Sequence, residues 1–335
     1  MPDTNRQIRL AARPQGELKP TDWEHVDTPA AAPGEGEFAG VTRMISLDPA
    51  MRGWLDDRPS YVPPVGLGEV MRAGSVIEVV ESNHPKFAVG DHVVGMFGVQ
   101  ERVVSDGRGA LAVDPGAAPL STYLSALGMP GMTAYFGLLD VGALKEGETV
   151  LVSGAAGAVG SMVGQIAKIK GCRVVGIAGG PDKCELLTDE LGFDAALDYR
   201  SDGFKQALRE ATPDGVDVYF DNVGGEILDL ALTRLAMKAR VVICGAISQY
   251  NNETAVKGPS NYLSLLVRRA RMEGFVVFDF AQRYAEGAQA IAGWIAEGKI
   301  TSQEHVVQGS VDDFHDTLQM LFRGENVGKL VLEIG

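Results

Sequence analysis

The sequence predicts an α/β fold, in which a doubly wound parallel sheet of the Rossmann type is joined to a second, β-rich domain. Two observations predict it. Between about residues 127 and 302, apolar strand-like runs alternate with helical patterns, as in a parallel sheet covered by helices. Residues 1–126 instead contain short alternating runs separated by Pro, Gly and Asp, which is typical of a β-rich domain.

Six strand-like segments alternate with helical patterns in the middle of the chain, and we expect strands near residues 149–153, 173–178, 194–198, 216–221, 240–245 and 273–278. In the first domain, residues 74–80 and 92–96 alternate as strands do. After residue 300, β-like runs return on either side of a helical segment at 311–323. We therefore expect residues 303–335 to return to the first domain's sheet.

Composition excludes several classes of protein. The chain has 335 residues, 45% of them hydrophobic, and a formal net charge of −14, which disfavours nucleic acid and anionic membranes as partners. No apolar run is long enough to span a bilayer, and the first ten residues contain no apolar signal core. We expect a soluble protein that acts on a small molecule.

Cysteine and histidine usage predicts no metal. Cys172, Cys184 and Cys244 contain no closely spaced pair, so neither a disulfide framework nor a cysteine-built zinc site is expected. This usage suits the reducing cytoplasm. The five histidines also lie far apart, without the spacing of a zinc motif.

The most informative segment is TVLVSGAAGAVGS, residues 149–161. A strand-like run leads into three glycines, Gly154, Gly157 and Gly160, and a helical pattern follows at once. Strand, glycine turn and helix together offer a nucleotide diphosphate the N–H groups and positive dipole end of a helix N-terminus. The GxxGxxG spacing differs from the commonest GxGxxG form, but its position between strand and helix indicates a dinucleotide site.

The second strand favours NADP over NAD. NAD sites usually place an acidic residue at the end of this strand, whereas here it ends in Ala178, Gly179 and Gly180. Lys183 follows shortly afterwards, with Tyr199 and Arg200 beyond the next apolar segment, so cationic groups are available for a 2′-phosphate. Asp182 is better explained as a residue of the helix start, next to Pro181.

Two later strands end in polar residues beside glycines, in the segments YFDNVGG (219–225) and CGAISQYN (244–251). In open α/β sheets, ligands bind at the carboxyl ends of the strands. We therefore expect cofactor contacts here, at the side that faces the N-terminal domain, although Asn and Gly are also ordinary turn residues.

Six blocks of sequence resemble the medium-chain dehydrogenase/reductase superfamily, within it the zinc-independent group of prostaglandin reductases and leukotriene B4 12-hydroxydehydrogenases, with bacterial curcumin reductases and plant double-bond reductases. They are GMPGMTAYFGLLDVG, GAAGAVGSMVGQIAKIKGCRVVGIAG, DVYFDNVGG, VVICGAISQYN, RMEGFVVFDF and ENVGKLVLEI. The blocks occur in family order over nearly the whole chain. Ser46, Asp48 and Arg72 stand in the regions where zinc-dependent relatives would carry first-domain ligands, which disfavours a zinc enzyme.

The resemblance implies a GroES-like substrate domain (1–126), a Rossmann domain that binds NADP (127–302) and a C-terminal return to the first domain (303–335). It further implies a homodimer. The cofactor-binding residues that it implies are Ala156, Gly157, Ala158, Val159, Gly160, Lys183, Tyr199, Asn222, Cys244, Gly245, Tyr250, Phe275, Val276, Val277 and Asn326.

The implied reaction is NADPH-dependent reduction of the α,β carbon–carbon double bond of enals and enones, with hydride added to the β-carbon. Negative charge then develops on the carbonyl oxygen, where pre-aimed donors stabilise it. Candidate donors are the Tyr250 hydroxyl, a ribose hydroxyl of the cofactor and backbone N–H groups. Val267 stands where some relatives carry a tyrosine proposed as the proton donor, and the nearest tyrosine is Tyr262. Candidate substrate-lining residues are Arg52, Trp54, Tyr61, Met132 and Tyr135.

Three alternatives remain at this point. A quinone reductase would use a similar scaffold, because quinones and enones are both conjugated hydride acceptors. Oxidation of an allylic alcohol on a lipid mediator ranks lower, because no ionisable relay for removing the alcohol proton is apparent. A protein that binds NADP without turnover belongs to another class and would bind the cofactor tightly without oxidising it.

Overall fold

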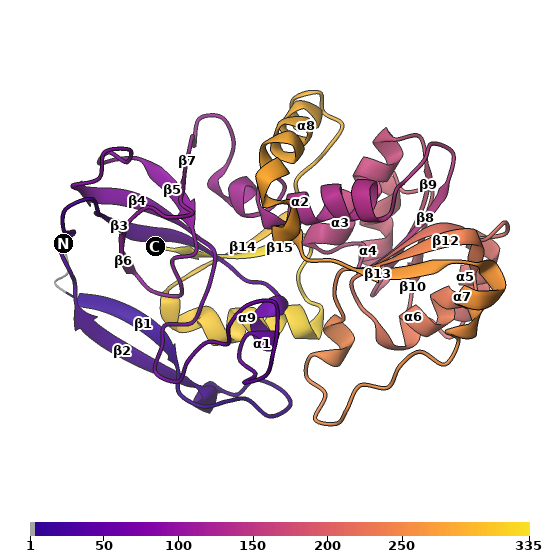
Figure 1. Ribbon diagram of the computed structural model, residues 1–335, viewed down its shortest axis with the longest axis horizontal. Coiled ribbons are helices and arrows are strands. Elements are labelled where there is room, and N and C mark those ends of the chain that lie inside the picture. Colours follow the sequence, from indigo (N-terminus) through magenta and orange to yellow (C-terminus); the bar gives the residue numbers. More distant parts are fainter. Residues whose placement is uncertain (1–3) are drawn as a thin grey trace. The chain divides into compact units, whose positions relative to one another are not determined.

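The computed structural model describes residues 4–335, which divide into two compact units. The first unit comprises the residues up to Leu124 together with Glu304–Gly335, and the second comprises Ser125–Gln303 (Figure 1). Among the described residues, no helix is both long and apolar enough to cross a membrane. All three cysteines are free thiols.

The second unit is built on a six-stranded sheet in which every strand pair is parallel, in the order β10-β9-β8-β11-β12-β13. This confirms the predicted doubly wound sheet. The strands are β8 (Thr149–Ser153), β9 (Arg173–Ala178), β10 (Ala195–Asp198), β11 (Val216–Asp221), β12 (Leu235–Ile243) and β13 (Arg271–Gly274).

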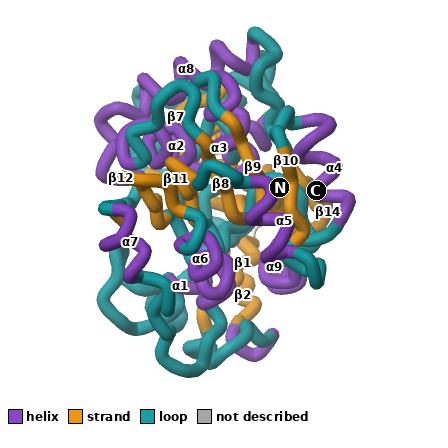
Figure 2. Tube along the Cα trace, turned by 90° about the vertical axis from the view of Figure 1, so that its right-hand side faces the viewer, coloured by secondary structure: helices purple, strands orange, loops and turns teal. Residues whose placement is uncertain are grey.

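Helices cover both faces of this sheet (Figure 2). They are α2 (Met129–Phe136), α3 (Ala158–Ile169), α4 (Pro181–Glu185), α5 (Phe204–Ala211), α6 (Gly225–Leu232), α7 (Leu263–Arg268) and α8 (Tyr284–Ala296). Successive residues of β8 face opposite sides, as the strand period of two requires. Val150 and Val152 join the core with α2, α3 and α8, whereas Leu151 joins the core with α5 and α6.

The last two strands differ from expectation. β12 begins five residues earlier than predicted and stops at Ile243, because the N–H groups of Cys244 and Gly245 turn back to the carbonyl oxygen of Asp221. β13 pairs with β12 only as far as Gly274. Residues 275–278, which we expected to belong to the strand near 273–278, therefore lie beyond it, and a 3₁₀ segment begins at Val277.

The first unit holds a seven-stranded sheet whose main order is β14-β15-β3-β4-β5-β7, with β6 also paired to β3, and a separate pair of β1 and β2. Its elements are β1 (Thr4–Leu10), β2 (Trp23–Pro29), β3 (Phe38–Ser46), α1 (Ala50–Gly53), β4 (Ser75–Ser82), β5 (His92–Gly95), β6 (Arg102–Ser105), β7 (Leu111–Val113), β14 (Glu304–Gly309), α9 (Phe314–Arg323) and β15 (Lys329–Ile334). The chain's last strand, β15, pairs antiparallel with β3. In this way residues from both ends of the sequence share one sheet.

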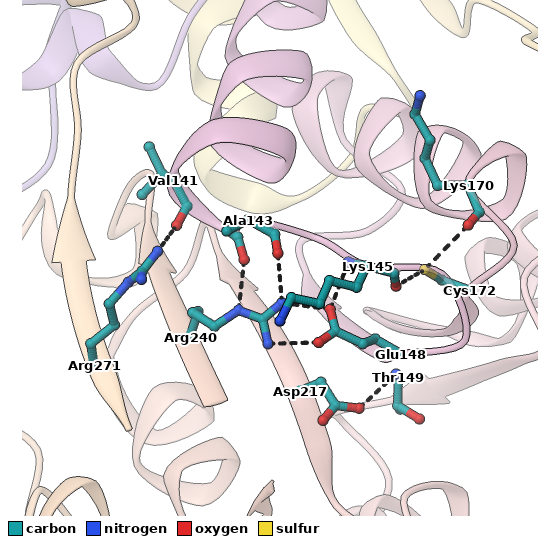
Figure 3. Close-up of polar contacts among 11 residues, drawn as sticks. Val141, Ala143, Lys145, Glu148, Thr149, Lys170, Cys172, Asp217, Arg240 and Arg271 are labelled. Carbon is teal, nitrogen blue, oxygen red and sulfur yellow. Dashed lines mark hydrogen bonds and ion pairs between the residues drawn. The ribbon is translucent and has the colours of Figure 1, made fainter. Parts of the chain in front are cut away.

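Hydrogen bonds and an ion pair of Arg240 connect chain segments at the amino ends of the parallel strands (Figure 3). Its guanidinium donates to the carbonyl oxygens of Gly142 and Ala143, 2.7 and 3.0 Å away, and pairs with both carboxylate oxygens of Glu148. Burial raises the pKa of Glu148, but the hydrogen bonds from Arg240 and the Lys145 N–H outweigh it, so the pKa lies below its ordinary value. The loop after α2 is thus tied to β8 and β12.

We expect Glu148→Gln to lower the free energy of unfolding towards the lower end of the roughly 3–5 kcal/mol that breaking a buried pair costs. Because the pKa of Glu148 is lower in the folded state, the contribution is present at neutral pH and lost as the pH falls through that pKa. Urea denaturation at several pH values should show the difference from wild type shrinking in acid. Glu297→Gln, in an exposed pair with Lys299, is the control, with an expected effect below about 1 kcal/mol. Equal losses for both variants at neutral pH would contradict this account.

Candidate active site

The glycine turn forms an open helix N-terminus at the carboxyl end of β8. Gly154 adopts a left-handed conformation with φ of 59°, and α3 begins at Ala158 with no side-chain cap. The Ser161 N–H makes the first helical bond, to the carbonyl oxygen of Gly157 at 3.0 Å. Helix geometry leaves the N–H groups of the first turn of α3, before Ser161, without intrahelical acceptors, and their dipoles favour an anion.

Close backbone approach explains why Gly160 is glycine. A Cβ atom there would lie 2.3 Å from the carbonyl oxygen of Gly154 and 2.8 Å from the Cα of Ala155. A Cβ atom on Gly157 would lie 3.2 Å from the carbonyl oxygen of Gly154. The turn and the first turn of α3 are therefore in contact without side chains, and this cradle fits a dinucleotide pyrophosphate.

Cationic side chains gather at the end of β9. The Tyr199 N–H donates to the Ala178 carbonyl oxygen at 3.1 Å, and the guanidinium carbon of Arg200 lies 5.6 Å from the centre of the Tyr199 ring. Burial, and then the charge of Arg200, lower the pKa of Lys183. Because that Coulomb effect is repulsive, a bound phosphate would relieve it.

Asp198 lies beside these cations and binds the backbone of the turn. One of its carboxylate oxygens accepts the backbone N–H groups of Gly180 and Arg200, each at 2.9 Å, and these two bonds lower the pKa of Asp198. The carboxylate thus shapes the turn after β9 through the backbone. Lys183 and Arg200, which sequence reasoning had grouped with Tyr199, are close enough for their charges to interact.

A buried carboxylate, which sequence reasoning missed, organises the ends of the next strands. Oδ1 of Asp221 accepts hydrogen bonds from Ser153 Oγ and Tyr219 OH, at 2.8 and 2.7 Å, and from the N–H groups of Val223 and Gly224. Burial, and then the charge of Asp221, raise the pKa of Tyr219 well above its usual range. The signal in the sequence was an acidic residue at the end of an apolar strand.

Asn222 is held against β8 from both its backbone and its side chain. Its N–H donates to Ser153 Oγ at 2.9 Å, and its Nδ2 donates to the Ser153 carbonyl oxygen at 2.7 Å. Burial, and then the charge of Asp221, raise the pKa of the Cys244 thiol to about 12, so this group stays protonated at neutral pH. Cys244 can therefore line a site but cannot act there as a thiolate.

The Tyr250 hydroxyl lies over the backbone that follows β12. It accepts the N–H of Ala246 at 3.1 Å, and a Cβ atom on Gly245 would lie 3.1 Å from it. A Cβ atom on Gly245 would also lie 3.4 Å from the Asn222 carbonyl oxygen. Gly245 therefore lies close to both Asn222 and Tyr250. Val267, at the position where some relatives have tyrosine, is 64% exposed on α7.

The remaining cofactor candidates divide between the two units. Phe275 packs edge-on against Phe220 with ring centres 6.3 Å apart, and Val277 is buried in the same core. Val276 is extended and leads into the 3₁₀ segment. Asn326 belongs to the first unit, where its Nδ2 donates to the Gly328 carbonyl oxygen at 2.8 Å.

The structure shows most substrate candidates in packing roles. Met132 is 3% exposed, and a Cβ atom on Gly287 of α8 would lie 2.9 Å from its sulfur. Tyr135 donates its hydroxyl to Glu286 at 3.2 Å. Arg52 is 3% exposed, and its guanidinium binds the Gly16 carbonyl oxygen and Asp56. These contacts explain Met132 and Arg52 as core residues, which the sequence pattern alone did not indicate.

The region expected to hold zinc ligands in zinc-dependent relatives holds a buried ion pair. Lys329 donates its Nζ to the Leu47 carbonyl oxygen and to Asp48 Oδ1, the latter at 3.0 Å, and Ser46 Oγ donates to Asp48 Oδ2. Burial lowers the pKa of Lys329, and Asp48 opposes that effect. Within residues 4–335, no group of three His, Cys, Asp or Glu side chains could hold a metal ion.

We expect Gly160→Ala to lower the free energy of unfolding by roughly 1–3 kcal/mol, because the new Cβ overlaps backbone that cannot move cheaply. Gly293→Ala on α8 is the matched control: its Cβ would meet nothing within 4 Å, so helix propensity should stabilise that variant by roughly 0.5–1 kcal/mol. Urea denaturation measures both. Stabilisation by Gly160→Ala would contradict the close approach.

Known proteins resemble the chain over its whole length. Residues 6–113 match a family model described as the N-terminal domain of oxidoreductase, and residues 158–293 match one described as zinc-binding dehydrogenase. An NADPH-dependent curcumin reductase of Escherichia coli is 42% identical, covering 98% of this chain and 97% of the relative. An NADP(+)-dependent 2-alkenal reductase of Nicotiana tabacum is 39% identical, covering 99% of this chain and 98% of the relative.

A solved structure extends the likeness to three dimensions. CurA from Vibrio vulnificus, in complex with NADPH, is 42% identical with a TM-score of 0.94, covering 98% of this chain and 99% of that one. The sequence relatives are named NADP-dependent reductases, and the glycine cradle and the cations after β9 fit that cofactor. The chain is an NADP-dependent oxidoreductase and belongs to the medium-chain dehydrogenase/reductase superfamily, in its zinc-independent group of curcumin, alkenal and prostaglandin reductases.

Proposed function

We propose that the protein reduces the α,β carbon–carbon double bond of enals and enones with NADPH. The observation that carries the proposal is the full-length identity of about two residues in five to reductases named for curcumin and for alkenals. Both acceptors have a carbonyl conjugated to a carbon–carbon double bond. An acceptor of this kind needs hydride at one carbon and a stabilised negative charge on the carbonyl oxygen.

The geometry of the second unit supports the cofactor-binding roles that we propose for its residues. The segment from Ala156 to Gly160 would hold the pyrophosphate, chiefly through the backbone N–H groups of the first turn of α3. Lys183, Tyr199 and Arg200 would hold the 2′-phosphate. Asn222 and the segment from Cys244 to Tyr250 would contact the nicotinamide half, and Phe275 to Val277 would support it. When bound, the cofactor supplies the hydride.

Tyr250 is the proposed donor to the developing oxyanion. Its hydroxyl oxygen already accepts the Ala246 N–H, so the hydroxyl proton is directed away from that bond. A hydroxyl held by the backbone is pre-oriented, and removing one such donor typically costs about 10²–10³-fold in kcat. The α-carbon can take its proton from water, because an enolate is basic.

The deciding test follows NADPH absorbance with medium-chain 2-alkenals, enones, curcumin and quinones, and repeats each with NADH. We expect turnover of enals and enones with NADPH. Turnover confined to quinones would move the assignment to a quinone reductase. Tight NADPH binding without oxidation by any acceptor would indicate a cofactor-binding protein without turnover.

Lys183→Ala adds a test of cofactor choice. One charge-assisted hydrogen bond is worth roughly 1.5–3 kcal/mol, so KM for NADPH should rise roughly ten- to hundred-fold while that for NADH stays unchanged. Lys205→Ala on the exposed face of α5 is the control and should change neither value. A parallel loss with both cofactors would show that Lys183 does not read the 2′-phosphate.

We further propose a homodimer formed through β13, in the reducing cytoplasm that the three free cysteines suit. Every residue of β13 is exposed, and it pairs with β12 on one side. Antiparallel pairing of two copies about Met272 would set Arg271 of each opposite Glu273 of the other. Leu266 on neighbouring α7, 74% exposed, and Met272, 39% exposed, add apolar surface.

Glu273→Arg tests the dimer, because it would set like charges opposite each other across the pair. Light scattering after size exclusion should give a dimer for the wild type and a monomer for the variant. The control Glu297→Gln, on an exposed turn after α8, should stay dimeric. A monomeric wild type would overturn the proposal and leave the reductase assignment untouched.

A further inference from the structure

A surface hollow of about 410 Å³ lies within the second unit, at the amino end of its parallel sheet. Its walls are the loop before β11, the turn that leads into β12, the first residues of β12 and the last residue of α7. The glycine cradle follows the carboxyl end of β8, which pairs parallel with β11. The hollow and the cradle therefore lie at opposite edges of one sheet, and the hollow has a volume typical of small-molecule sites.

An irregular stretch of β12 forms one side of the hollow. Val216 and Val218 of β11 pair with Leu235 and Arg240 of β12, so β12 carries extra residues between the two pairs. Lys238, one of these residues, has a left-handed backbone with φ of 61°, which residues with a side chain rarely adopt. Bulges of this kind bend a strand and redirect its side chains. Here the bulge interrupts the pairing of β11 with β12 beside the hollow.

Arg234 lines the hollow, and hydrogen bonds hold its guanidinium in place. Nε donates to Thr212 Oγ1 at 3.1 Å, and Nη2 donates to the Thr212 carbonyl oxygen. The Arg234 carbonyl oxygen accepts the Val216 N–H at 2.9 Å, so the backbone at this residue is fixed as well. None of these bonds uses Nη1, which carries two of the five N–H donors of a guanidinium. Arg234 is thus an oriented cation with donors beyond those that Thr212 takes.

Arg268 adds a second cation from another element. It is the last residue of α7 and is exposed. Within residues 4–335, no carboxylate oxygen lies within 4.0 Å of the guanidinium nitrogens of Arg234 or Arg268. Asp214, which is exposed, is the acidic residue among the described residues that line the hollow. Two guanidinium groups and one carboxylate leave a local excess of positive charge in a chain of net charge −14.

We propose that the hollow binds the phosphate group of a small phosphate monoester between Arg234 and Arg268, while the cradle holds NADP. A guanidinium binds a phosphate through paired N–H donors, and two guanidinium groups match the two negative charges of a monoester. A phosphate group alone would occupy only part of the 410 Å³. Met237, 47% exposed, also lines the hollow and would contact the organic part of the ester. This site goes beyond the proposed enone reduction and does not depend on which acceptor the enzyme reduces.

Calorimetry tests the proposal by titrating phenyl phosphate into the equimolar complex of the protein with NADPH, at constant ionic strength. NADPH then fills the cradle and its 2′-phosphate site, so the measured binding reports on the hollow. At about pH 7.5 the ester carries close to two negative charges, and we expect one site with a Kd of about 1 mM or lower. Benzoate has a similar ring but a single charge, and it should bind at least about ten-fold more weakly.

Three substitutions at the hollow should shift the Kd in opposite directions. Arg234→Gln and Arg268→Gln should each weaken phenyl phosphate binding roughly ten-fold or more, because each removes a charge-assisted hydrogen bond. Asp214→Asn should strengthen binding roughly two- to five-fold, because it removes a like charge. Arg108→Gln is the control, since it removes an exposed arginine from a loop of the first unit and should leave the Kd unchanged.

Arg268→Gln keeps the test decisive if Arg234→Gln fails to fold, because Arg268 is exposed whereas Arg234 is bonded to Thr212. Circular dichroism and urea denaturation check folding, and unchanged NADPH affinity checks that the cradle is intact. No binding of phenyl phosphate up to about 10 mM, benzoate binding of equal strength, or an unaltered Kd in Arg268→Gln would overturn the proposal. A failure to reduce enones would count against the proposed function alone.

Discussion

The cofactor-binding half of the molecule depends on one buried carboxylate, that of Asp221. Its Oδ1 takes donors from β8, from β11 and from the turn after β11, and its carbonyl oxygen takes the two N–H groups that end β12. A buried charge is costly unless hydrogen bonds compensate it, and here the compensating donors are the groups that must be fixed. Oδ2 has no hydrogen-bond partner, so the stabilisation falls on one oxygen.

This arrangement explains how a site made largely of backbone keeps its shape. The glycine turn has no side chains with which to brace itself, and the loop bearing Tyr250 consists of short turns. Ser153 links them, because it donates to Asp221 and accepts the Asn222 N–H. At the opposite end of the strands, Arg240 and Glu148 form an ion pair that fixes the loop after α2 against the sheet. The parallel sheet is therefore held at both ends by buried charged groups.

The first unit uses buried charge in another way. The ion pair of Lys329 and Asp48 joins β15, the last strand of the chain, to the residues that follow β3. A cation thereby lies where the family resemblance leads one to look for zinc ligands, and both Asp48 oxygens are engaged. Hydride transfer to a conjugated acceptor does not require a Lewis acid if fixed donors stabilise the oxyanion. The arrangement thus agrees with the membership of this chain in the zinc-independent group.

The sequence by itself determined the fold class, the strands at 149–153, 173–178 and 216–221, the glycine cradle and the preference for NADP. These features are local, because a few consecutive residues determine whether a strand is buried and whether a turn can bind phosphate. Only the tertiary structure decided the rest. Arg240 meets Glu148 across 92 positions, and Lys329 meets Asp48 across 281. The end of β13 follows from where its neighbour stops, and the burial of Arg52 and Met132 follows from elements distant in sequence. Long-range pairing of polar groups has no period that a single sequence reveals, since its energy depends on which chain segments the fold brings together.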